Sequence, residues 1–232
     1  HATTYRVTEM GDDTEPLFLP ARFPYSICNG SAGIAVGYAS NMPPHNPDEV
    51  IDTCIAFYKN KIKKSDDVLK YMQGPDFPTG GEILGIDGIK EYFNTGSGSF
   101  TIRGKYKIED LTRGRKLINF YELPYQVSVA KIIESVYKLQ ERNQLKEISE
   151  VKDLSDSKRG LSCAIYVKSG SNVNKVIDDL FKSTPLQSKF SANMTALYKG
   201  VPKPNISMYE MIEGFCVFRQ DCFIKRMSHR LE

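Results

Sequence analysis

The sequence contains no tryptophan and only three histidines, at positions 1, 45 and 229. Its five cysteines follow no metal-like spacing, so we expect no zinc site and no other metal site in this chain. An odd number of irregularly spaced cysteines also argues against a disulfide framework. The thiols are therefore predicted to be free, as in a reducing compartment.

Long hydrophobic runs are also absent. No apolar stretch approaches the roughly 18 to 20 residues that a membrane-spanning helix needs, and no charged and then apolar leader opens the chain. The 41% hydrophobic and 25% charged residues are typical of a water-soluble globular protein. We expect a soluble, cytoplasmic protein of 232 residues, folded as one large domain or as one domain with an appended piece.

Acidic residues are missing from two segments, 16–47 and 180–209, although the chain holds 28 of them. The net charge of +3 says little about partners by itself. A surface that faces a polyanion would keep carboxylates away in this manner. Chance clustering of the acidic residues is the alternative explanation.

The pattern of apolar residues predicts an α+β protein. Asn46 followed by Pro47, Asp48 and Glu49 is a typical helix start, and it precedes apolar residues at helical spacing. Helices are expected at 47–58, 65–72, 86–94, 128–141, 172–183 and 207–232, and strands at 100–108, 116–123, 146–152, 162–168 and 190–198. Adjacent pairs of strands separated by helices favour a mostly antiparallel sheet with flanking helices.

No motif indicates a self-contained active site. Gly30, Gly33 and Gly37 are not spaced as in a dinucleotide-binding loop, and residues 98–105 have one residue too many between their glycines for a phosphate-binding loop. No serine lies in a nucleophile elbow. The adjacent aspartates of the chain fall in loops or helix caps. We therefore expect no catalytic residue within this chain.

Several runs occur in the order of a known family's signature. They are residues 19–24 (LPARFP), 29–39 (NGSAGIAVGYA), 43–46 (PPHN), 74–80 (GPDFPTG), 85–88 (GIDG), 95–96 (TG), 122–127 (ELPYQV) and 153–160 (DLSDSKRG). Together they resemble the breakage-reunion subunit of type IIA DNA topoisomerases, which is the A subunit of DNA gyrase or of topoisomerase IV. The resemblance extends from about residue 12 to the final helix.

The resemblance implies a tower-like domain with its borders. Residues 1–45 would hold the end of the winged-helix region and a DNA-bending loop, 46–206 the tower domain, and 207–232 the start of a coiled-coil helix. The family's catalytic tyrosine lies in an Arg-Tyr-Thr-Glu-like sequence further upstream. Tyr5 does not match, because its arginine follows it and because only 24 residues separate it from Asn29. The isolated chain is thus expected to be inactive.

The resemblance also implies a DNA-binding site. An isoleucine at the position of Ile34 inserts between base pairs of the gate DNA in the family, and such an apolar wedge unstacks a step and kinks the duplex. Alternatively, Ile34 is an ordinary residue of the buried core. His45 is either a DNA contact or a structural hydrogen-bonding residue. The expected DNA-binding residues are Arg22, Asn29, Gly30, Ser31, Gly33, Ile34, His45 and Lys131.

The implied function is binding and bending of the gate segment during ATP-dependent passage of one DNA duplex through another. The chain itself would hold no cofactor; Mg²⁺ and ATP would be bound mainly by the partner, the ATPase/TOPRIM (B-type) subunit. Double-stranded DNA and a second copy of the breakage-reunion subunit would be the other partners, in a bacterial or phage-infected cell. Gyrase and topoisomerase IV stay equally open. A stand-alone architectural DNA-bending protein and a spacer without DNA affinity are the alternatives.

Overall fold

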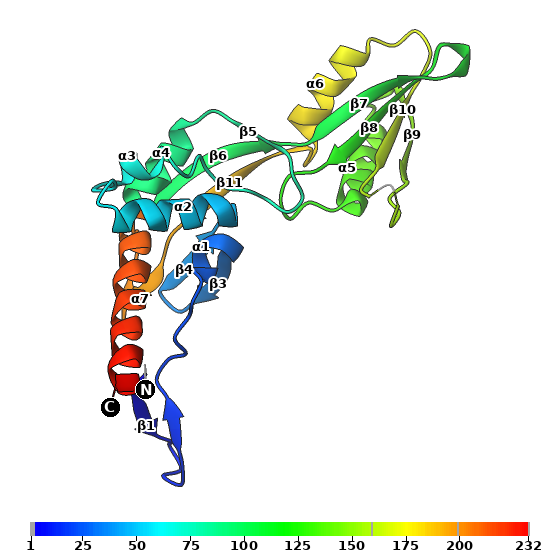
Figure 1. The fold of residues 1–232 in the computed structure, drawn as a ribbon. Coiled ribbons are helices and arrows are strands. Elements are labelled where there is room, and N and C mark those ends of the chain that lie inside the picture. Colours follow the sequence, from blue (N-terminus) through cyan, green and yellow to red (C-terminus); the bar gives the residue numbers. More distant parts are fainter. Residues whose placement is uncertain (1–2, 159, 199, 232) are drawn as a thin grey trace. The chain divides into compact units, whose positions relative to one another are not determined.

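The computed structural model describes residues 3–158, 160–198 and 200–231, and residues 1, 2, 159, 199 and 232 lie outside the described residues. The chain forms two compact units (Figure 1). The terminal unit comprises residues 1–76, 89–98 and 191–232, and the central unit comprises residues 77–88 and 99–190. None of the described helices is both long and apolar enough to cross a membrane.

Helix α2 of the terminal unit spans Pro47–Tyr58, as its start signals predict. The Asn46 side chain accepts hydrogen bonds from the backbone amides of Asp48 at 3.0 Å and Glu49 at 3.4 Å. Pro47 occupies the first helical position, where no amide hydrogen is needed. The local sequence therefore determines where this helix begins.

Helix α7 (Met208–Leu231) packs against α2 in the terminal unit (Figure 1). It begins with the predicted capping box: Glu210 accepts from the Ser207 amide at 2.9 Å, and the Ser207 hydroxyl accepts from the Glu210 amide at 3.3 Å. The Tyr58 hydroxyl at the end of α2 donates to the Cys216 carbonyl at 2.7 Å. This bond fixes the two helices against each other.

Smaller elements complete the terminal unit. Near the N-terminus, strands β1 (Tyr5–Val7) and β2 (Thr14–Pro16) form an antiparallel pair. The others are α1 (Tyr25–Asn29), β3 (Ser31–Ala35), β4 (Tyr38–Met42), α3 (Ser65–Val68), most of α4 (Asp87–Thr95), β12 (Ala196–Tyr198) and β13 (Val201–Lys203). The largest buried side chains include Ile27, Met72, Tyr92 and Phe93.

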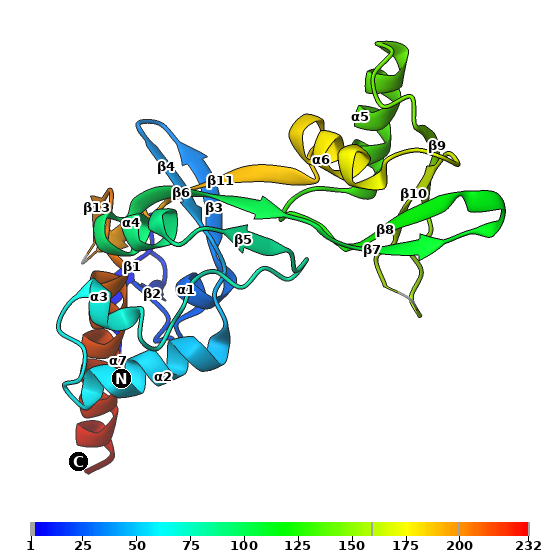
Figure 2. The ribbon, with the colours of Figure 1, turned by 90° about the horizontal axis from the view of Figure 1, so that it is seen from above.

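The central unit contains a four-stranded antiparallel sheet covered by two helices (Figures 1 and 2). Its strand order is β7-β8-β10-β9, with β7 (Lys105–Asp110), β8 (Lys116–Glu122), β9 (Ile148–Asp153) and β10 (Cys163–Val167). A short 3₁₀ turn at Thr112–Gly114 joins β7 to β8. The amphipathic helices α5 (Val129–Glu141) and α6 (Val173–Ser183) bury their apolar faces against the sheet.

Two predicted strands are interrupted, and their boundaries are corrected. The expected strand 100–108 divides at Gly104 into β6 (Ser97–Arg103), which neighbours β11 in a five-stranded sheet, and β7, which pairs with β8 in the four-stranded sheet. The expected strand 190–198 divides into β11 (Gln187–Asn193), which neighbours β6, and β12 (Ala196–Tyr198), which pairs with β13 in a separate two-stranded sheet.

The expected helix 65–72 ends early, at Val68, and a short strand β5 (Glu82–Leu84) pairs with β6 where none was predicted. The other helix predictions agree with the structure to within two residues. The predicted class, an α+β fold with mostly antiparallel strands, is confirmed.

Candidate nucleic-acid interface

The acid-free segment 16–47 folds into a short helix and a β-hairpin. Helix α1 follows Pro24 and is anchored by the buried side chains of Ile27 and Cys28. Strands β3 and β4 then pair from Ser31↔Met42 at the base to Ala35↔Tyr38 at the tip (Figure 2). Val36 and Gly37 form the two-residue turn, and Gly37 has a φ of 80° that favours glycine. Asn41 anchors the hairpin, since its side-chain amide donates to the Ser191 carbonyl at 2.7 Å.

Gly30 and Gly33, both predicted as DNA-binding residues, differ in whether the fold requires a glycine at their position. At Gly30, φ is 70° and an added Cβ would lie 2.5 Å from the Met42 carbonyl oxygen and 2.9 Å from the Pro44 nitrogen. At Gly33, an added Cβ would meet open space, and φ is not positive. Gly30 is thus a structural glycine, whereas no contact within the described part of the chain requires a glycine at position 33.

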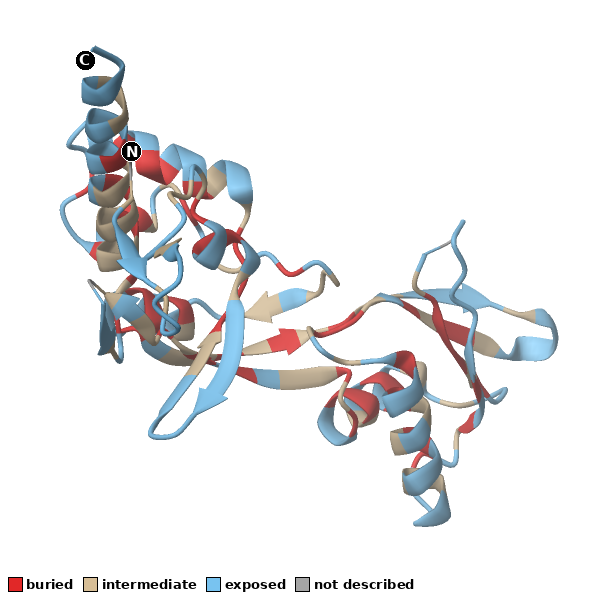
Figure 3. Ribbon diagram, turned by 90° about the horizontal axis from the view of Figure 1, so that it is seen from below, coloured by how far each residue is buried: buried red, intermediate tan, exposed pale blue. Residues whose placement is uncertain are grey.

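Strand β3 is exposed along its whole length (Figure 3). The side chain of Ile34 is 95% exposed and that of Val36 is 102% exposed. Opposite Ile34 in the ladder stands Ala39, which is too small to cover it. The alternative interpretation of Ile34 as a residue of the buried core is therefore wrong. Two exposed branched apolar side chains at the end of a hairpin instead form a surface that water solvates poorly.

The polar residues that precede and open the hairpin are accessible. Arg22, Asn29 and Ser31 all have exposed side chains. Among the described residues, Arg22 makes no ion pair with a carboxylate, so its charge is available to a ligand. The segment 16–47 thus combines exposed polar donors with an apolar hairpin tip and contains no acidic residue, a composition suited to a polyanion.

His45 lies in the interior, with 2% of its surface exposed. Its Nδ1 is 2.9 Å from the Ile27 carbonyl oxygen and its Nε2 is 2.9 Å from the Tyr92 hydroxyl. A carbonyl only accepts hydrogen bonds, so Nδ1 carries the proton and Tyr92 donates to Nε2. Both ring nitrogens are therefore used inside the protein. This geometry agrees with the structural alternative for His45 and leaves no surface for direct contact with a ligand.

Burial lowers the pKa of His45 from its ordinary 6.5 to about 4. Because the neutral ring is favoured in the folded state, its contribution to stability is complete above pH 6.5 and is lost as the pH falls toward 4, at a total of about 3 kcal/mol. We expect urea unfolding to show this loss in the wild type and a shallower pH dependence in His45→Gln. Equal pH slopes for the two proteins would contradict the assignment.

Lys131 belongs to the central unit, in the first turn of α5. Its amide donates to the Ser128 hydroxyl at 3.3 Å, which caps the helix. Its side chain is exposed and makes no ion pair within the described part of the chain. The side chain is therefore accessible to a ligand. Lys131 and the hairpin belong to different compact units of the chain.

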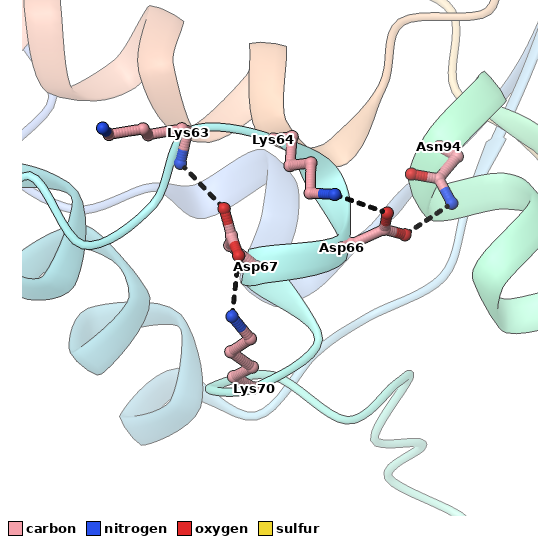
Figure 4. Close-up of polar contacts among 6 residues, drawn as sticks. All are labelled: Lys63, Lys64, Asp66, Asp67, Lys70 and Asn94. Carbon is pink, nitrogen blue, oxygen red and sulfur yellow. Dashed lines mark hydrogen bonds and ion pairs between the residues drawn. The ribbon is translucent and has the colours of Figure 1, made fainter.

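Residues 59–64, which follow α2, are rich in lysine, and nearby aspartates neutralise part of the positive charge in this region (Figure 4). Lys64 lies 3.4 Å from Asp66, and Lys70 lies 2.8 Å from Asp67. The bond from Lys70 and the backbone amide of Lys63 lower the pKa of Asp67. The stretch therefore mixes both charges in the manner of a solvated surface.

Sequence reasoning missed Val36 and Tyr38 as residues of the hairpin tip. Both are exposed, Tyr38 at 46%. The alternation of Ile34, Val36 and Tyr38 around Gly37 was the available signal for a strand and turn. Elsewhere, the described residues contain no group of three or more His, Cys, Asp or Glu side chains that could hold a metal ion.

Comparison with known proteins gives consistent matches. The family model for the A subunit of DNA gyrase/topoisomerase IV matches residues 2–232. The DNA gyrase A subunit of Ureaplasma parvum is 42% identical over 220 residues, which are 95% of this chain and 26% of that protein. The DNA gyrase A subunit of Staphylococcus epidermidis is 41% identical over 222 residues, 96% of this chain and 25% of that protein. That of Halalkalibacterium halodurans is 40% identical over 221 residues, with 95% and 26% covered. The chain thus spans about a quarter of the length of these relatives.

Proposed function

Because the chain belongs to the family of DNA gyrase and topoisomerase IV A subunits, we propose that it binds double-stranded DNA as the gate segment and bends it. The observation that carries this proposal is the 95% exposure of Ile34 on a hairpin without a carboxylate. An exposed branched side chain of this kind can insert between two base pairs and unstack them. The hairpin is anchored at its base, so that the wedge is held in place.

A wedge alone does not stabilise bent DNA. Unstacking a base step costs a few kcal/mol, and bending a short duplex by 40 to 90° costs on the order of 1 to 6 kcal/mol. Contacts with the phosphates along the bent flanks must offset these costs. Arg22 supplies a charge, Asn29 and Ser31 supply neutral donors, and Gly33 lets the backbone of β3 approach the DNA closely. These contacts carry no sequence preference.

The remaining predicted residues have different proposed roles. Gly30 and His45 hold the hairpin from inside the protein: Gly30 makes the close turn into β3, and the His45 ring joins Ile27 of α1 to the buried Tyr92. Lys131 would contact a phosphate from the exposed start of α5.

In the complete enzyme we assign the chain to the breakage-reunion subunit of a type IIA topoisomerase, which forms a homodimer and joins an ATPase/TOPRIM partner. The nucleophilic tyrosine would come from another part of that subunit, so the isolated chain would not cleave DNA. Mg²⁺ and ATP would be bound mainly by that partner. Residues 46–206 would form the tower domain, and α7 would begin the coiled coil of a cytoplasmic enzyme. Similarity over 95% of the chain favours this role over that of a stand-alone architectural protein.

Binding is tested by fluorescence anisotropy with a labelled duplex of about 30 base pairs at several salt concentrations. We expect sequence-independent affinity near 10⁻⁴ to 10⁻⁶ M at physiological salt, weakening as salt rises. Arg22→Ala should reduce the slope of log K against log salt by about 1, because one phosphate contact is lost. If Lys131 also contacts a phosphate, Lys131→Ala gives a similar reduction.

Lys90→Ala is the matched control, since Lys90 is an exposed cation of the terminal unit outside the hairpin. Its salt slope should equal that of the wild type. A wild-type chain that fails to bind at low salt overturns the proposed function. Equal slopes for the wild type and Arg22→Ala remove Arg22 from the interface while leaving DNA binding in place.

A further inference from the structure

Arg103, at the end of β6 in the central unit, is held in place by two uncharged side chains. Its guanidinium carbon lies 4.4 Å from the centre of the Phe181 ring. Its Nε and Nη2 both donate to Oε1 of Gln187, at 2.9 and 2.6 Å. Phe181 is itself fixed, because it is buried and its ring meets that of Phe120 edge to face at 5.9 Å. The guanidinium is thus oriented by the fold alone.

The charge of Arg103 has no counter-ion in the part of the chain that the structure describes. Its side chain is partly buried, and no carboxylate lies within ion-pair distance. Glu82 stands opposite Arg103 in the ladder between β5 and β6, so the two side chains share a face of the sheet. Glu82 is nevertheless exposed and forms no ion pair with the guanidinium. A cation withdrawn from water is normally paired with an anion, because the lost hydration must be replaced.

The unused donors of Arg103 form a fork of the kind that binds phosphate. A guanidinium has five N–H donors in one plane. Gln187 occupies the edge that Nε shares with Nη2. The edge between Nη1 and Nη2 has no partner among the described residues. Two oxygens of one phosphate group match the spacing of these two donors.

We propose that Arg103 is the centre of a phosphate-binding site on the central unit, and, because this rests on the proposed function, that its ligand is a phosphodiester of the DNA duplex. Lys189 adds a second charge. It follows Gln187 by two residues on β11, so it lies on the same side of the strand, and it is exposed and without an ion pair in the described chain. Both residues belong to 180–209, the second acid-free segment, which the hairpin does not use.

The first readout is thermal unfolding of the intact chain in rising inorganic phosphate, with the ionic strength held constant by chloride. A ligand that binds the folded state raises Tm. Phosphate also stabilises every variant through a general salt effect, so the site is measured by the difference between proteins. We expect a larger rise for the wild type than for Arg103→Gln. Lys146→Ala is the matched control, since it removes an exposed cation just before β9, the opposite edge strand of the four-stranded sheet, and it should respond as the wild type does.

The second readout is the salt dependence of binding to a duplex of about 30 base pairs. Arg103→Gln should reduce the slope of log K against log salt by about 1, because one phosphate contact is lost. Lys189→Ala should weaken both readouts. Glu82→Gln should strengthen both, because it removes the carboxylate that stands opposite the guanidinium. A purely structural role of Arg103 predicts no such gain.

Equal phosphate responses of the wild type and Arg103→Gln overturn the site. If Arg103→Gln does not fold, the exposed positions Glu82 and Lys189 decide instead: opposite changes support the site, and unchanged readouts overturn it. A phosphate response that requires Arg103, together with an unchanged salt slope, retains the site but rejects DNA as its ligand in favour of a free phosphate compound. A wild-type chain that fails to bind DNA at low salt rejects the proposed function, whereas the phosphate response still decides the Arg103 site.

Discussion

Gly30→Ala is expected to destabilise the terminal unit by about 2 to 4 kcal/mol, which is among the largest effects of any single methyl group in this chain. Two costs add at this position. The backbone has a φ of 70°, which L side chains rarely adopt, and the new Cβ would lie 2.5 Å from the Met42 carbonyl oxygen. The obstructing oxygen is a main-chain atom of the hairpin, so it cannot move aside at a small cost.

Urea unfolding followed by circular dichroism measures this loss, and Gly33→Ala is its control. At Gly33 the added Cβ meets open space, so the free energy of unfolding should stay constant or rise by up to about 1 kcal/mol. If the backbone of β3 approaches DNA, the same substitution should weaken DNA binding nonetheless. Equal stability losses for the two variants would show that the close contact at Gly30 relaxes, contrary to our expectation.

The elements that the sequence predicted well are those with local start signals. Helix α2 begins at Pro47 because the Asn46 cap and the proline act within four residues, and α7 begins with the capping box of Ser207 and Glu210. Residues this close in the chain interact regardless of the rest of the fold. Their effects could therefore be predicted without knowledge of tertiary contacts.

Strand boundaries depended on distant partners and were predicted less well. At Gly104 the chain passes from β6, which neighbours β11, to β7, which pairs with β8, and after Asn193 it passes from β11 to β12, which pairs with β13. A change of pairing partner of this kind is set by distant parts of the sequence, and no local pattern indicates it. The end of α3 at Val68 likewise left no signal in its sequence.

For the candidate site, too, local features could be predicted and features that depend on tertiary structure could not. The resemblance indicated the hairpin segment and Ile34, but not that β3 is exposed on both faces. The alternation of Ile34, Val36 and Tyr38 was a strand signal, but the three glycines of the segment led to the prediction of a loop. The burial of His45 also required tertiary information, since Tyr92 lies 47 residues away in the chain.

Ile34→Ala is expected to abolish most of the DNA bend while leaving the protein's stability within about 0.5 kcal/mol of the wild type. The side chain is 95% exposed, so its removal opens no cavity. Ile27→Ala makes the opposite change: Ile27 is 1% exposed, and truncation in the core typically costs about 2 to 5 kcal/mol. Comparison of the two variants therefore distinguishes a DNA-inserting side chain, whose loss affects bending, from a core side chain, whose loss affects stability.

Fluorescence energy transfer between the ends of a duplex of about 30 base pairs measures the bend, at low and moderate salt. The wild type should shorten the end-to-end distance, and Ile34→Ala should bind but leave the duplex close to straight. Val36→Ala is the sharper control, because Val36 is equally exposed two residues along the hairpin. A bend that survives Ile34→Ala rejects the wedge. A bend lost equally with both variants assigns the distortion to the apolar tip as a whole, because only a specific intercalating side chain predicts that one position matters far more than its neighbour.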